Sequence, residues 1–253
     1  DSGTQAITGD ATFTNTAGDD DAITLDDASN AFSGTVTFAT DSGSAVTIVD
    51  TTALDLVALT AASLSATSGG AVTDSGTLAI AGATTISASG QDITLDQAAS
   101  TFGTLALTGA NVAVTENAAT DLGASTISGT FGITSGGAIT DSGTQAITGD
   151  ATFTNTAGTD DAITLDDASN AFGGTVTFAT DSGSAVTIVD TTALDLVALT
   201  AASLSATAGG AVTDSGTLAI AGATTISASE QDITLDESAS TFGTLALTGA
   251  NVA

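Results

Sequence analysis

Apolar and polar residues alternate along most of this chain with a period of two. Runs such as Val36/Phe38, Ile93/Leu95 and Phe131/Ile133 place two apolar side chains on one side, and Thr, Ser, Ala, Gly or Asp flank them. This alternation is typical of a strand that is buried on one face only. The sequence therefore predicts an all-β protein built from short strands.

The stretch Gly103–Leu122 shows the repeating element and reads GTLALTGANVAVTENAATDL. Two alternating runs, Leu105/Leu107 and Val112/Val114, are separated by a Gly-Ala-Asn corner. Gly, Asn, Asp and Ser recur at corners along the rest of the chain, and these residues tolerate the backbone conformations of tight turns. Each such segment is expected to make one turn of chain.

The whole chain is repetitive, because the sequence that begins at Asp1 returns almost unchanged at Asp141. A weaker repeat starts at each DSGT motif and divides the chain into the segments 1–73, 74–140, 141–213 and 214–253. We predict one continuous domain over positions 1–253, a fragment of a longer array, with one full repeat (1–140) and one partial repeat (141–253).

The two copies differ at six positions, which we expect to lie outward or at corners. The pairs are Asp19/Thr159, Ser33/Gly173, Ser68/Ala208, Gly90/Glu230, Gln97/Glu237 and Ala98/Ser238.

A parallel β-solenoid fits this repetition better than a meander of hairpins. In a solenoid, matching positions of successive coils stack, so that inward side chains build one core and each interior strand pairs with the coils on both sides. The sequence predicts a parallel β-solenoid of roughly 11 coils of about 19–30 residues, with the length differences at the corners.

The composition supports a packed chain and sets its electrostatics. Apolar residues make up 42%, which is too many for a disordered chain, and 29 Asp and Glu with no Lys, Arg or His give a formal net charge of −29. Such a surface repels nucleic acid and anionic lipid, and we expect salt or divalent ions to stabilise the fold. No apolar run approaches the length of a membrane span.

Catalytic side chains are scarce, because the chain has no His, Cys, Lys, Arg or Tyr. Two carboxylates suffice for glycoside hydrolysis, but a sugar site usually also needs aromatic platforms, and the nine Phe fall at repeat positions suited to the core. We therefore predict that the protein is not an enzyme and requires no cofactor, and a solenoid that cuts polysaccharide is the less favoured alternative.

The acidic corners are the strongest candidates for a binding site, because clustered carboxylates offer the hard oxygen ligands that Ca²⁺ prefers. The candidate ligands are Asp19, Asp20, Asp21, Asp26, Asp27, Asp160, Asp161, Asp166 and Asp167. The glycine-rich nonapeptide of calcium-binding β-rolls is absent, and the second copy has Thr159 in place of Asp19. We favour solvated turns that attract cations diffusely, with a weak Ca²⁺ site as the alternative.

Threonine pairs suggest a second kind of site. Thr12/Thr14/Thr16 and Thr35/Thr37 would form outward ladders, and flat arrays of this kind bind ice in some solenoids. Other coils carry different residues at the matching positions, so ordinary strand propensity is the favoured explanation.

Two segments resemble the repeats of very large bacterial surface proteins. They read ITLDDASNAFSGTVTFAT (23–40) and DITLDQAASTFGTLALTGANVAVTENAATDLGASTISG (92–129). The proteins concerned are the filamentous-haemagglutinin-like adhesins and β-strand-repeat proteins of Gram-negative bacteria. The resemblance covers the whole chain and implies a right-handed parallel β-helix, export across the outer membrane and a stalk or fibre role.

From these observations we expect a structural, non-catalytic segment of a giant secreted or cell-surface fibre that serves adhesion or cell–cell contact. The alternative is a self-associating extracellular matrix, sheath or filament. The expected partners are neighbouring repeats of the same protein, further copies bound laterally or end to end, and an unknown receptor, without nucleic acid or membrane insertion.

Overall fold

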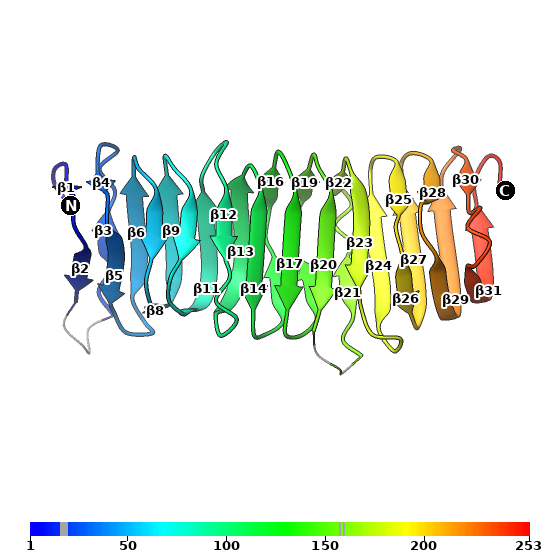
Figure 1. Cartoon of the computed structure of the whole chain (residues 1–253), viewed down its shortest axis with the longest axis horizontal. Coiled ribbons are helices and arrows are strands. Elements are labelled where there is room, and N and C mark those ends of the chain that lie inside the picture. Colours follow the sequence, from blue (N-terminus) through cyan, green and yellow to red (C-terminus); the bar gives the residue numbers. More distant parts are fainter. Residues whose placement is uncertain (16–19, 157, 159) are drawn as a thin grey trace. The chain divides into compact units, whose positions relative to one another are not determined.

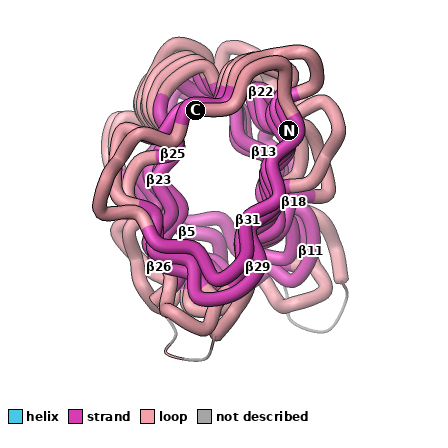
Figure 2. The backbone as a smooth tube through the Cα atoms, turned by 90° about the vertical axis from the view of Figure 1, so that its right-hand side faces the viewer, coloured by secondary structure: helices cyan, strands magenta, loops and turns pink. Residues whose placement is uncertain are grey.

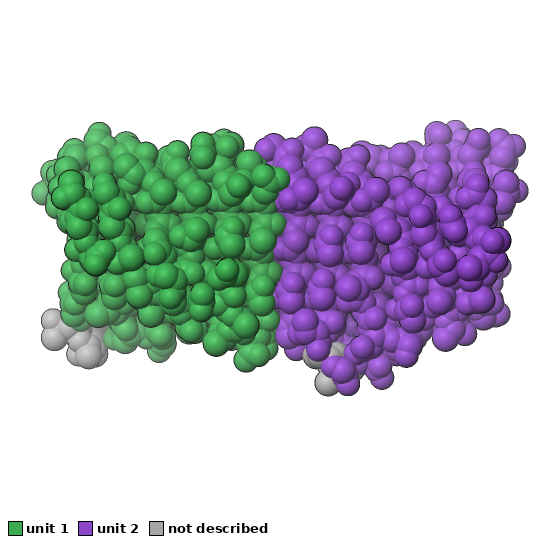
Figure 3. All heavy atoms as spheres, viewed as in Figure 1, with its two compact units in different colours: residues 1–118 green, residues 119–253 purple. Residues whose placement is uncertain are grey.

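A computed structural model describes residues 1–15, 20–156, 158 and 160–253. The described residues form 31 strands and no helix, and accordingly they include no helix long and apolar enough to cross a membrane. Parallel strands stack in about 11 turns, which confirms the predicted all-β parallel solenoid. The chain divides into two compact units, Asp1–Ala118 and Ala119–Ala253 (Figure 3).

Unit 1 contains two long parallel sheets (Figure 1). Sheet I of unit 1 consists of β2 (Ala11–Thr14), β5 (Thr35–Ala39), β7 (Leu54–Leu56), β10 (Val72–Asp74), β12 (Ile93–Leu95) and β14 (Val112–Glu116). Sheet II of unit 1 consists of β3 (Ile23–Leu25), β6 (Ala45–Asp50), β9 (Ser63–Ser68), β11 (Leu78–Ser87) and β13 (Thr101–Gly109). Shorter strands complete the coils: β1 (Ala6–Ile7) pairs with β4 (Ala31–Phe32), and β8 (Leu59–Ala61) pairs with β11.

Unit 2 repeats this arrangement. Its sheet I consists of β17 (Phe131–Ser135), β20 (Ala151–Asn155), β23 (Thr175–Ala179), β25 (Leu194–Leu196), β28 (Val212–Asp214) and β30 (Ile233–Thr234). Its sheet II consists of β15 (Thr120–Leu122), β18 (Ile139–Asp141), β21 (Ile163–Leu165), β24 (Ala185–Asp190), β27 (Ser203–Ala208), β29 (Leu218–Ala228) and β31 (Thr241–Thr248). The shorter strands are β16 (Ser125–Ile127), β19 (Gln145–Ile147), β22 (Ala171–Phe172) and β26 (Leu199–Ala201).

The register between coils shows how much chain one turn uses. In unit 1, Ala11 pairs with Val36, whereas Leu54 pairs with Val72, so the first of these turns uses more chain than the second. The extra chain lies in loops, which Figure 2 shows at the corners between straight strand segments.

The core follows the predicted alternation. Leu105, Leu107, Val112 and Val114 are all at most 2% exposed. Aromatic rings stack from coil to coil within a unit, as in Phe13 over Phe38, with ring centroids 5.9 Å apart. Other register positions change in volume from one coil to the next, as where Phe131 pairs with Ala151 and Ile133 with Phe153, so that a larger side chain of one coil meets a smaller one of the neighbouring coil.

One strand motif occurs on both sheets. In unit 1 the sequence ITL forms β3 in sheet II and β12 in sheet I. Both sheets offer the same kind of parallel neighbour, so an alternating triplet fits either of them. The DSGT-based repeat is therefore not a whole number of coils.

Most of the residues that differ between the two copies are exposed. Asp19 and Thr159 lie outside the described residues. One pair is buried. Ser68 is 5% exposed and Ala208 is 2% exposed, so these two residues meet the expectation of a corner position but do not face outward. Both residues end a sheet II strand and point inward at a corner.

Candidate functional site

The predicted acidic corners are turns at the surface. Asp20, Asp21, Asp26, Asp160 and Asp166 are exposed, and Asp27, Asp161 and Asp167 are partly buried, whereas Asp19 lies outside the described residues. Among the residues that the structure describes, no three acidic side chains come close enough together to hold a metal ion. Calcium binding at these corners stays a prediction.

The predicted threonine ladder is short. Thr12 and Thr37 are register partners on neighbouring strands of sheet I, and Thr16 lies outside the described residues. Thr35 lies at a different register position from Thr37, and its partner on the following strand is Asp55, so a carboxylate and not a second hydroxyl lies beside it. Ice binding through a flat threonine array stays the less favoured interpretation.

Asp166 and Asp167 contribute backbone amides to a clasp around Asp141. The Asp141 Oδ1 atom accepts a hydrogen bond from the amide of Asp166 at 2.8 Å. Its Oδ2 atom accepts one from Asn170 Nδ2 at 2.5 Å and one from the amide of Asp167 at 3.4 Å. Since Asp141 lies on the coil before the other residues, this clasp ties two successive coils together.

Every DSGT aspartate makes a clasp of this kind. Besides Asp141, Asp1 accepts a hydrogen bond from Asp27 N at 3.2 Å, Asp74 from Asp96 N at 2.8 Å and Asp214 from Asp236 N at 2.9 Å. Each donor is the last residue of an ITLD motif or the residue directly after it. The sequence contains this signal, because each DSGT motif is followed by an ITLD motif before the next DSGT begins, but the pattern alone does not show that the two motifs are partners.

Burial changes the acidity of the clasp residue Asp74. Its side chain is 5% exposed, and burial raises its pKa to about 6, although hydrogen bonds from the amides of Asp96 and Gln97 act in the opposite direction. The buried Oδ2 atom of Asp74 has no hydrogen-bond partner.

A second set of polar side chains points inward at one corner of each unit, where sheet II ends. We name it the inner polar column. Its members are Gln5, Asn30, Asp50 and Ser68 in unit 1 and Ser125, Gln145, Asn170 and Asp190 in unit 2. All of them are buried except Gln5, which is half-buried.

Asp190 bonds through one of its two carboxylate oxygens. Its Oδ1 atom accepts hydrogen bonds from Phe172 N at 3.1 Å, Thr192 N at 2.9 Å and Thr192 Oγ1 at 2.8 Å. Its Oδ2 atom is buried and has no hydrogen-bond partner. Asp50 has the same arrangement with Phe32 and Thr52 at 2.9–3.0 Å.

Burial of this carboxylate disfavours its charge. The Asp190 side chain is 1% exposed, and its desolvation raises the pKa, while the three hydrogen bonds lower it to a smaller extent. Sequence reasoning missed Asp50 and Asp190, although the alternation that buries Val46 and Ile48 also places Asp50 on the inward side.

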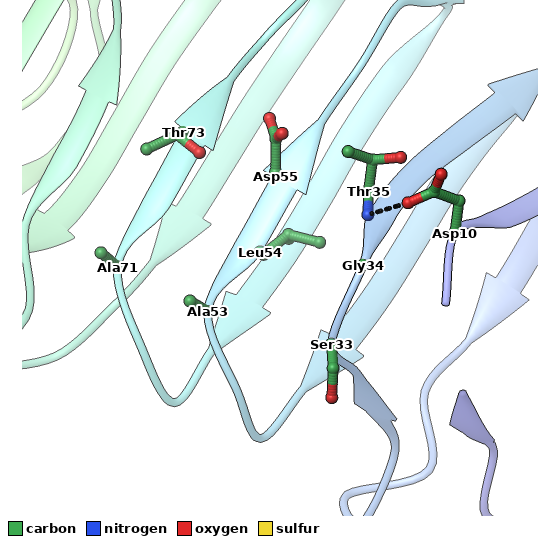
Figure 4. Close-up of a pocket in the computed structure, with 9 residues that line it drawn as sticks. All are labelled: Asp10, Ser33, Gly34, Thr35, Ala53, Leu54, Asp55, Ala71 and Thr73. Atoms are coloured by element: carbon green, nitrogen blue, oxygen red, sulfur yellow. Dashed lines mark hydrogen bonds between the residues drawn. The ribbon is translucent and has the colours of Figure 1, made fainter. Parts of the chain in front are cut away.

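A shallow groove of about 330 Å³ lies on sheet I of unit 1 (Figure 4). Asp10 Oδ1 accepts a hydrogen bond from Thr35 N at 3.1 Å across it, and the buried Oδ1 atom of Asp55 has no hydrogen-bond partner. In unit 2 the equivalent Asp195 Oδ1 accepts one from Ser215 N at 3.0 Å. The groove offers carboxylate and hydroxyl oxygens to an O–H or N–H donor, and none of its lining residues is aromatic.

The comparisons with known proteins find one family. A family model described as "Repeats of unknown function (DUF5649)" matches residues 1–39, 43–108, 109–179 and 183–249. No curated protein and no solved structure matches the chain.

Proposed function

We propose that this chain, which belongs to this family of repeats of unknown function, forms with its coils a structural, non-catalytic segment of a giant secreted or cell-surface fibre. The segment acts as a stalk for adhesion or cell–cell contact, in the extracellular space or on the bacterial surface. This role requires no cofactor, and its constant partners are the neighbouring repeats of the same protein.

The use of the polar side chains carries this proposal. The clasp aspartates, the asparagines and aspartates of the inner polar column and Asp10 all accept hydrogen bonds from backbone amides of an adjacent coil. These groups therefore reinforce stacking, which is what a load-bearing repeat needs. The backbone hydrogen bonds of both sheets also run between coils, so tension along the stacking direction is shared by many bonds at once.

The surface charge and the family resemblance support a location outside the cell. A net charge of −29 keeps repetitive strands soluble and separate. The segments at 23–40 and 92–129 resemble the repeats of bacterial surface adhesins, and that resemblance implies a solenoid stalk.

Immunogold electron microscopy of the producing cells tests the proposal, with an antibody raised against the repeat that spans positions 1–140. Label along thin fibres that leave the cell surface is the expected result. Label confined to the cell interior would overturn the surface role, and label over a continuous coat would favour the alternative described next.

A self-associating matrix, sheath or filament is the second candidate, and one observation favours it. The outward residues of sheet II in unit 1 include no carboxylate; on β6, β9 and β11 they include Thr47, Val49, Ser65, Thr67, Thr85 and Ser87. On this face, copies of the chain approach each other without direct charge repulsion.

A further inference from the structure

Two buried aspartates of the inner polar column have no role in the stalk beyond holding a corner, yet they carry an ionisable group into the core. Asp50 and Asp190 are each 1% exposed. In each, Oδ1 accepts three hydrogen bonds and the buried Oδ2 atom has no hydrogen-bond partner. A carboxylate with one unpaired buried oxygen is strongly disfavoured unless a cation or a proton neutralises it.

The surroundings supply no cation. The chain contains no Lys, Arg or His. The groups that contact Asp190 are the Phe172 and Thr192 donors, with Ala208 as its register partner on the following coil. For Asp50 the equivalent groups are Phe32, Thr52 and Ser68, none of which titrates.

Other carboxylates contact the asparagines of the inner polar column, which lie one coil away from the buried aspartates. Asp1 accepts a hydrogen bond from Asn30 Nδ2 at 2.9 Å, and Asp141 accepts one from Asn170 Nδ2 at 2.5 Å. Both bonds go to the asparagine and not to the buried aspartate. Any negative charge there opposes ionisation of the neighbouring rung.

The asparagine rungs show what a neutral side chain does at this corner. Asn30 Oδ1 accepts the amide of Gln5 at 2.7 Å, and Asn170 Oδ1 accepts the amide of Gln145 at 2.7 Å. Asp50 and Asp190 accept the amides of Phe32 and Phe172 in the same way. A neutral carbonyl oxygen is therefore sufficient for the contact between coils, and the negative charge adds no bond at Oδ2.

We propose that Asp190 forms a proton-operated latch. It takes up a proton at Oδ2 as the solution becomes mildly acidic, and the neutral side chain holds its corner more firmly than the carboxylate does. No covalent bond between heavy atoms changes, since the proton comes from solvent and Oδ1 keeps its three donors. The burial that raises the pKa of Asp190 acts in this direction. The inference goes beyond the stalk role and does not depend on it.

The first test measures protonation directly in the wild-type protein. Carbon-13 NMR of the side-chain carboxyl groups is recorded from pH 3 to 8, and the signal of Asp190 is assigned by its loss in Asp190→Asn. The expected result is a titration of Asp190 with a midpoint clearly above those of the exposed aspartates. A midpoint at or below those of the exposed aspartates would overturn the latch.

The second test measures its effect on stability. The wild-type melting temperature should rise from pH 7.5 to pH 5.0. The variant Asp190→Asn should melt higher than wild type at pH 7.5, and its own rise towards pH 5.0 should be smaller by about 2–4 °C. The reverse variant Asn170→Asp should melt lower at pH 7.5 and show a larger rise. An Asp190→Asn variant that melts lower at pH 7.5 and keeps the full acid-induced rise would contradict the proposal.

Discussion

At the scale of single residues, the two copies of the repeat act as a natural substitution experiment. Gly90 adopts a φ of +74°, and the residue at the same position of the second copy, Glu230, adopts +59°. Glycine tolerates this left-handed conformation without steric strain, whereas a side chain is disfavoured in it by roughly 1 kcal/mol. The second copy therefore carries backbone strain at this exposed corner that the first copy lacks.

Replacement of the strained residue should stabilise unit 2. Glu230→Gly is expected to raise the free energy of unfolding by roughly 1 kcal/mol, measured by urea denaturation, because it relieves the left-handed strain. Glu230→Gln removes the same charge but keeps the side chain, and it serves as the control. An equal gain in both variants would show that the charge and not the backbone limits stability there.

The acidity of Asp74 gives a pH-dependent prediction. Its folded pKa of about 6 lies above the ordinary value of 3.8, so the folded state binds a proton more tightly than the unfolded state. The stability that this group contributes is fully present below pH 3.8 and is lost as the pH rises through 6. Asp74→Asn keeps the acceptor for Asp96 N, so the variant should be more stable than wild type at pH 7.5 by about 1–2 kcal/mol, and the gain should shrink towards pH 4.

Asp150 provides a control of opposite sign for Asp74. It is exposed, and the hydrogen bond from Thr175 N at 2.9 Å lowers its pKa. Its stabilising effect is present above the ordinary pKa and is lost as the pH falls, so Asp150→Asn should weaken the protein at pH 7.5. If urea denaturation showed the same pH trend for both variants, the environments assigned to the two carboxylates would be wrong.

The alternation of apolar and polar residues predicts which side chains are buried at many positions. The parity of each run correctly predicts that Leu105, Leu107 and Ile93 are buried, because side chains of a strand alternate strictly between its faces. The same parity buries Asp50, which sequence reasoning does not single out because a charged residue is not expected in a core. The clasps could not be predicted from the sequence, since pairing a DSGT aspartate with a particular amide requires the register between coils.

At the scale of elements, strand type was predictable but strand placement was not. The triplet ITL forms a strand in both halves of unit 1, yet Ile23–Leu25 lies in sheet II and Ile93–Leu95 lies in sheet I. Which sheet a strand joins depends on the summed length of all corners before it. A slightly longer corner leaves the local alternation of apolar and polar residues unchanged, but it changes which sheet the following strand joins.

The uncharged outer face of sheet II leads to a prediction about assembly. If copies associate through it, the triple variant Thr47→Asp/Thr67→Asp/Thr85→Asp should remain monomeric where the wild type forms lateral bundles, because three carboxylates would meet in the contact. Analytical ultracentrifugation at raised ionic strength measures this effect.

A matched variant separates position from charge. Thr37, Thr73 and Thr94 point outward from sheet I of unit 1, so their replacement by Asp adds the same three charges to a different face. This variant should associate as the wild type does, and both should keep the same β-type circular dichroism. Equal loss of association in both variants would mean that total charge, and not sheet II, governs assembly.

At the scale of the whole molecule, every charged side chain is negative. With 29 carboxylates and no basic side chain, the molecule contains no side-chain ion pair that dilution of salt would strengthen. Repulsion among exposed carboxylates extends over about 10 Å at 0.1 M salt and over about 30 Å at 0.01 M. Compaction brings these charges together, so repulsion should act against the folded state at all ionic strengths and most strongly at low salt.

The melting temperature should therefore rise steadily as NaCl increases from 10 to 300 mM at pH 7.5, by several degrees in total, because screening weakens repulsion more in the compact state. Ca²⁺ added at matched ionic strength separates screening from binding. A rise equal to that with NaCl would assign the effect to diffuse screening, whereas a larger rise that Asp20→Asn/Asp21→Asn removes would reveal a calcium site at the acidic corner. A melting temperature that does not change with either salt would show that repulsion among the carboxylates does not limit stability and that the stacked core alone sets it.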